Sequence, residues 1–202
     1  MRASIALRVA CTLLVAALAP SPAAAHLNAT GLGPIYDGAA HLLTSPDDLL
    51  AVLALSLWAG LRGAGHGRRV LFTLPGAWLL GSLVGMTTAG AVGGNVVSAL
   101  WLIALGALLA ADLTLSPHVS IALAALLGVQ RGYLNGAGME ASPSAVVAVL
   151  GLGSTVFVLV AFAAAFVVRL RAAWARVAVR VIGSWVAASG LLLLGWSMRV
   201  HS

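Results

Sequence analysis

The chain has 202 residues, of which 61% are hydrophobic and 8% are charged, and it carries a formal net charge of +6. Together with a mean hydropathy of +1.07, these proportions exclude an ordinary soluble globular domain. They predict an all-α, polytopic membrane helix bundle whose main partner is the lipid bilayer.

The first 25 residues, 1–25, have the pattern of a secretory signal peptide, with a basic start, a short apolar core and an A-x-A cleavage site. The core is shorter than the roughly 17 residues that a span needs, which favours cleavage over an uncleaved signal anchor. Cleavage would leave His26 at the mature N-terminus. A periplasmic segment over 26–45 and a transmembrane domain over 46–202 would follow.

Six apolar stretches after the signal have about the length that a membrane-spanning helix requires. The predicted spans are 46–64, 70–87, 93–111, 117–138, 143–168 and 173–198. Three of them begin with Ser-Pro, in which serine can cap the free amides and proline suits the first helical position.

Arginine positions predict the orientation of these spans, because the chain has no lysine. Most arginines fall between the first two spans or around the start of the last one: Arg62, Arg68, Arg69, Arg169, Arg171, Arg176 and Arg180. Segments 26–45, 87–93 and 139–142 contain none, and Arg199 is the exception to this positive-inside pattern. We therefore expect a multi-pass protein of the cell inner membrane with a periplasmic mature N-terminus. Topology accounts for the net charge, so no nucleic-acid partner is expected.

The fourth span carries the most unusual polar residues, Arg131 and Asn135, one helical turn apart. A charge at that depth costs about 2.5 to 3.5 kcal/mol, so it needs a partner or a water-filled cavity. Gly128, Gly132 and Gly136 form a strip along the same helix on which another helix can approach closely. Both features are expected to face protein rather than lipid.

Histidines and carboxylates gather at the expected outer ends of the first and fourth spans. The candidate metal ligands are His26, His41, Asp47, Asp48 and Glu140. Imidazole and carboxylate groups together suit a divalent transition metal. A structural role is the alternative for some of them, with Ser45 as a helix cap and the two aspartates facing the positive end of the helix dipole.

Arg131 has an expected partner on this outer side. It lies 14 residues past Pro117, which is about 21 Å along a helix and within the outer third of a core about 30 Å thick. Asp48 would enter the bilayer from the same side, and pairing of a guanidinium with a carboxylate stabilises both charges. We therefore predict an ion pair from Arg131 to Asp48 or Asp47. An arginine reaching the headgroups alone and an arginine that helps to move a substrate are the alternatives.

Two segments resemble the signatures of the HupE/UreJ family, the hydrogenase and urease accessory membrane proteins. Residues 38–63, GAAHLLTSPDDLLAVLALSLWAGLRG, resemble the first signature, approximately H-P-x-x-G-x-D-H-L-L-A-M-L-A-V-G-L-W-A. Residues 128–140 are similar to the second, H-G-x-A-H-G-x-E. The resemblance extends over nearly the whole chain and implies nickel or cobalt uptake for metalloenzyme assembly. Ni²⁺ or Co²⁺ would be the transported ion, and no cofactor is certain.

The chain departs from both signatures at histidine positions. His41 and Asp47 match the first signature, but Asp48 stands where its second histidine is expected. Arg131 and Asn135 replace the two histidines of the second signature. A fixed cation cannot ligate a metal and repels one nearby. The exchange of a His/His pair for an Arg/Asp pair would keep the helix contact while removing the metal.

Two functions from different classes are consistent with these residues. One is a nickel or cobalt permease-like carrier with a degenerate, more acidic site, in which Glu140 replaces the acidic residue that the family has at the position of Gly138. The other is a membrane scaffold or partner-binding protein that transports no metal and whose protein partner the sequence does not identify. An enzyme is not expected, because no nucleophile and base stand at helical spacing.

Overall fold

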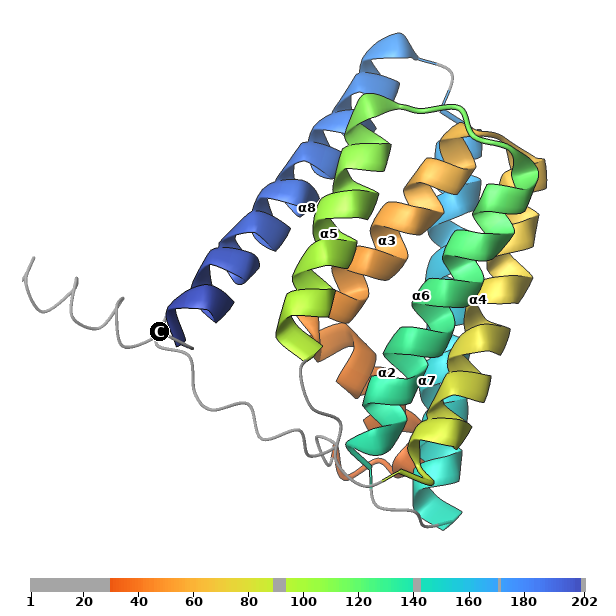
Figure 1. The fold of residues 1–202 in the computed structure, drawn as a ribbon. Coiled ribbons are helices and arrows are strands. Elements are labelled where there is room, and N and C mark those ends of the chain that lie inside the picture. Colours follow the sequence, from red (N-terminus) through yellow and green to blue (C-terminus); the bar gives the residue numbers. More distant parts are fainter. Residues whose placement is uncertain (1–29, 89–93, 140–142, 171, 201–202) are drawn as a thin grey trace, which may run out of the picture.

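The computed structural model describes residues 30–88, 94–139, 143–170 and 172–200. The predicted signal peptide, His26 and Glu140 lie outside these residues. The described part is all-helical, which confirms the predicted class (Figure 1). Its helices are α2 (Pro34–Thr44), α3 (Pro46–Leu61), α4 (Ala64–Gly85), α5 (Gly94–Ala111), α6 (Pro117–Ala137), α7 (Pro143–Val168) and α8 (Ala173–Val200). All but α2 overlap the stretches predicted as spans, and α4 begins earlier than the 70 expected for it.

Helix α2 lies in the segment 26–45, for which the sequence predicted no helix. It meets α3 at an angle of 78°. The bend follows from Pro46, because a proline disfavours helical geometry in the residue before it, and Ser45 is extended with φ −96 and ψ 94. The Ser45 hydroxyl donates to the His41 carbonyl at 2.7 Å and does not cap α3, so the predicted serine cap is wrong.

Helix α3 occupies the centre of the bundle, with α5 and α8 on one side and α4, α6 and α7 on the other (Figure 1). Its side chains are buried on nearly every face. The fully or almost fully buried apolar members are Ala51, Val52, Ala54, Leu55, Trp58 and Ala59. A helix that is apolar all round is typical of a buried or membrane-embedded position.

Glycines allow several pairs of helices to approach closely, since a side chain at these positions would collide with the backbone of the neighbouring helix. A Cβ at Gly132 of α6 would lie 2.1 Å from the carbonyl oxygen of Trp78 in α4. Gly106 of α5 stands in the same relation to α8, and Gly38 of α2 to α7. The contact at Gly132 holds α6 against α4, and this packing positions the polar residues of α6.

Two helices are long and apolar enough to cross a membrane, namely α7 and the part of α8 from Ala173 to Arg199. The bent pair of α2 and α3 adds a third if it forms one broken span. A shorter apolar helix lies within α5, from Asn95 to Ala111. The described residues therefore contain two or three candidate spans by length and composition, fewer than the six that the sequence predicted.

Polar contacts tie the helices together at the end of the bundle farthest from α2. Arg62, at the end of α3, forms an ion pair with Asp112, which follows α5. Close by, the Trp58 indole N–H donates to the carbonyl of Leu113 at 3.0 Å. These contacts connect the end of α3 with the segment that leads from α5 to α6.

Candidate functional site

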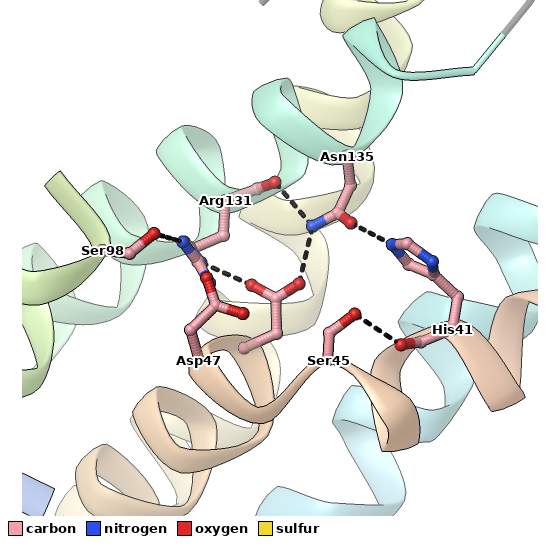
Figure 2. A network of polar contacts seen from close by, with 7 residues as sticks. His41, Ser45, Asp47, Ser98, Arg131 and Asn135 are labelled. Carbon is pink, nitrogen blue, oxygen red and sulfur yellow. Dashed lines mark hydrogen bonds and ion pairs between the residues drawn. The ribbon is translucent and has the colours of Figure 1, made fainter. Parts of the chain in front are cut away.

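The bend between α2 and α3 brings together residues from two helix ends. His41 lies in the last turn of α2, while Asp47 and Asp48 lie in the first turn of α3. Helix α6 supplies Arg131 and Asn135, which point from its outermost turns toward the bend (Figure 2). We call this cluster the polar site.

Arg131 occupies the middle of the polar site and uses all three nitrogens of its guanidinium. Its Nε donates to Oδ1 of Asp48, its Nη2 lies 2.5 Å from Oδ2 of Asp47, and its Nη1 donates to the Ser98 hydroxyl. Arg131 and Asp48 are each 4% exposed. The predicted ion pair is therefore confirmed, and it includes both aspartates. Removal of one partner from a buried pair strands the other charge, which makes the contact important for stability.

Asn135 connects the ion pair to His41. Its Nδ2 donates to Oδ2 of Asp48 at 3.0 Å and to the Arg131 carbonyl at 2.9 Å. Both amide hydrogens are thereby used, and the amide oxygen accepts from Nε2 of His41 at 2.6 Å. An amide oxygen only accepts, so His41 Nε2 is the donor in this contact, and Nδ1 is the ring nitrogen that keeps a lone pair.

A cavity of about 240 Å³ adjoins these groups. It is lined by His41, Ser45, Asp47, Asp48, Asn95, Ser98, Arg131, Leu134 and Asn135. The side chain of Asp47 is 37% exposed, so the ion pair is accessible from this cavity. The cavity is large enough for several water molecules or a small polar solute.

Helix α5 contributes to the polar site, which the sequence did not predict. Asn95 and Ser98 line the cavity from the first turns of this helix, and Ser98 is buried against Arg131. A signal was present, because these are the two hydrogen-bonding side chains other than tryptophan in an otherwise apolar helix. Their spacing of three residues places them on one helix face.

The polar site brings together three of the predicted metal ligands, His41, Asp47 and Asp48. His26 and Glu140 fall outside the described residues. Among the residues that the structure describes, no three His, Cys, Asp or Glu side chains are grouped closely enough to hold a metal ion. The two carboxylates bind Arg131 instead, so the site does not fit a divalent metal as it stands.

The glycine strip of α6 faces α4 and not the cavity. A Cβ at Gly128 would lie 2.7 Å from the Leu74 carbonyl oxygen, and one at Gly136 would lie 2.1 Å from that of Ser82. Arg131 points about 100° away from this strip around the helix. Helix α6 therefore uses one face for packing against α4 and another for the polar site.

The fold and the polar site define an integral membrane protein. Its α7 and α8 have membrane-spanning length and composition, and its charged groups inside the bundle are paired, as charges within a membrane must be. The chain belongs to the HupE/UreJ family, because residues 13–193 match the family described as HupE / UreJ protein. No curated protein and no solved structure matches the chain.

Family membership supports an accessory or nickel- and cobalt-related membrane protein. The two segments that resemble the family signatures converge in the fold. His41, Asp47 and Asp48 of the first and Arg131 and Asn135 of the second line the same cavity. The positions at which this chain departs from the signatures therefore lie together in one site.

Proposed function

We propose that this chain is a HupE/UreJ accessory protein of the inner membrane with a degenerate metal site. In this proposal Arg131 is a built-in cation in the place that a metal ion would take, and the unaltered protein does not accumulate Ni²⁺ or Co²⁺ through the polar site. The observation that carries the proposal is the contact of the Arg131 guanidinium with both Asp47 and Asp48. The role left to the protein is that of a scaffold for a protein partner.

Electrostatics supports this proposal. Two unit charges about 4 Å apart interact by about 4 kcal/mol at an effective dielectric near 20, so a divalent ion beside Arg131 meets a repulsion of about 8 kcal/mol. The two carboxylates also attract such an ion, but Arg131 and Asn135 already contact three of their four oxygens, which leaves few ligands for a metal. Arginine stays protonated in proteins, so a change of pH does not free the aspartates.

The proposed topology has six spans and places the polar site on the periplasmic side. Its support is the arginine distribution, since Arg62, Arg68 and Arg169 lie at or near helix ends far from the bend between α2 and α3. Arginines at that end mark the cytoplasmic face. The cavity would then open toward the periplasm, where a protein partner or a solute could reach it.

A metal-accumulation assay tests the proposal. Cells that lack other nickel importers would express the unaltered chain, Asp48→His, or Asp48→His with Arg131→His, and cellular Ni²⁺ and Co²⁺ would be measured. We expect no accumulation above empty cells from the unaltered chain. The double variant restores imidazoles and should gain binding. The single variant is the matched control, because it adds a histidine but keeps the guanidinium, and it should gain none.

The second candidate function is the nickel or cobalt carrier itself. It is favoured by the exposure of Asp47 toward the cavity and by the family to which the chain belongs. Accumulation by the unaltered chain that is lost with His41→Ala or Asp47→Ala would establish this function and would overturn the degenerate-site proposal.

A further inference from the structure

A second cavity lies on the side of the bundle where α4 and α7 pack together, and we call it the α4–α7 groove. Its volume is about 230 Å³. Its lining comes from the start of α4 and the end of α7, and it includes Gly67, Arg68, Ala161, Ala164, Ala165 and Arg169. Apart from the two arginines, every lining residue is apolar or glycine.

Small side chains create the groove. Gly67 of α4 lies against Ala164 of α7, where an added Cβ would come within 3.3 Å of the Ala164 methyl group. Ala161, about one turn earlier in α7, and Ala165, the residue after Ala164, continue the floor. Larger residues there would fill the space, so the close approach of the two helices leaves a shallow apolar channel.

The two arginines give one end of the groove a positive charge. Arg68 and Arg169 are exposed, and they come from different helices. The chain has five acidic residues, and none of the four that the structure describes lines the groove. Asp112, which lies at the same end of the bundle, is paired with Arg62. The charge at the mouth of the groove therefore has no carboxylate to balance it among its lining residues.

The depth of these groups in a membrane matches a phospholipid. Arg169 directly follows α7, a helix of membrane-spanning length, so its guanidinium lies at the level of the headgroups. Ala161 is eight residues earlier in the chain, about 12 Å deeper along the helix. A phosphate at the arginines would thus leave an acyl chain in contact with the apolar floor.

We propose that the α4–α7 groove binds an anionic phospholipid of the cytoplasmic leaflet. Its phosphate would lie between Arg68 and Arg169, and one acyl chain would follow α4 and α7 toward the membrane centre. Basic pockets between membrane helices on the cytoplasmic side select anionic headgroups in this way. The proposal shares the predicted orientation with the proposed function, but it does not depend on the chemistry of the polar site.

Native mass spectrometry of the full chain in detergent tests the proposal. The protein would be titrated with phosphatidylglycerol, with phosphatidylcholine of the same acyl chains, and with glycerol 3-phosphate. We expect preferential binding of one phosphatidylglycerol. Each arginine contributes about 1 kcal/mol near an anionic lipid, so Arg68→Gln with Arg169→Gln should weaken this binding about 30-fold.

Two further variants separate the contribution of the arginine charges to lipid binding from that of the shape of the groove. Arg176→Gln with Arg180→Gln removes the same charge from the first turns of α8, outside the groove, and should leave binding unchanged. Ala165→Leu fills the groove without a change of charge and should weaken binding of both lipids. Equal binding of the two lipids, or unchanged binding after loss of Arg68 and Arg169, would overturn the proposal. Binding of glycerol 3-phosphate as tight as that of the lipid would show a site for free phosphate instead.

Discussion

At the scale of single residues, the polar site depends on one guanidinium that satisfies three neighbours. Arg131 holds Asp47, Asp48 and Ser98 from two other helices, although α3 and α6 make little close backbone contact. The side chains therefore bridge the space between α3 and α6. A guanidinium suits this role because its planar donors reach several acceptors at fixed angles.

Arg131→Ala should lower the free energy of unfolding by about 3 to 5 kcal/mol, because it strands a buried carboxylate. The measurement is reversible unfolding in mixed micelles, followed by circular dichroism. Arg131→Ala with Asp48→Ala should recover part of the loss, since the buried carboxylate is removed and only the more exposed Asp47 is left without its partner.

Arg131→Lys is the control for charge alone. A lysine keeps the charge but cannot reproduce the three contacts of the guanidinium. The free energy of unfolding of this variant should therefore fall between those of the unaltered chain and Arg131→Ala. Strict additivity of the alanine changes at Arg131 and Asp48 would show that the two residues are not coupled.

At the scale of helices, the glycines of α4 and α6 set the position of the polar site. Gly81 and Gly85 of α4 meet the backbone of α6 near Val129 and Tyr133, and the α6 glycines meet α4 in return. Because the backbones touch, a shift of α6 would move Arg131 away from α3. Helix packing and the geometry of the site are therefore linked.

Gly132→Ala should destabilise the protein by about 1 to 3 kcal/mol, the usual cost of overpacking. The new Cβ would lie 2.1 Å from the Trp78 carbonyl oxygen, so the helices must separate. Gly76→Ala is the matched control, because Gly76 is in α4 with nothing within 4 Å of its Cβ position. It should be neutral or slightly stabilising, since alanine favours a helix. The same unfolding assay compares them, and equal losses would refute the packing argument.

At the scale of the whole molecule, most arginines outside the polar site lie at the opposite end of the bundle from it, with Arg199 as the exception. Arg62, Arg68, Arg69 and Arg176 lie near the ends of α3 and the starts of α4 and α8. The bend between α2 and α3 lies at the other end (Figure 1), and the cavity adjoins this bend. This distribution of arginines follows the positive-inside rule, by which arginines gather on the cytoplasmic side of a membrane protein.

Cysteine labelling should show this orientation in intact cells. In a Cys11→Ser background, Ala64→Cys and Ser116→Cys should react with an impermeant maleimide only after permeabilisation, whereas Thr87→Cys should react from outside. All three side chains are exposed, so access depends on the membrane and not on burial. Reaction of all three from outside would contradict the proposed topology.

The sequence by itself determined the membrane class, the positions of most helices and the ion pair. Hydropathy indicates which segments avoid water, and a rise of about 1.5 Å per residue fixes how deep Arg131 and Asp48 lie. Both residues needed a partner at the same depth, so their pairing could be predicted.

Only the tertiary structure decided which helices are neighbours. Hydropathy is the same on all sides of a helix such as α5, so it could not show that Ser98 binds Arg131 or that α7 borders α4. The helix α2 and its bend into α3 were also missed, because local polarity suggested a loop where packing against α7 stabilises a helix. The polar site and the α4–α7 groove exist because glycines and alanines let particular backbones meet, and that choice depends on the whole bundle.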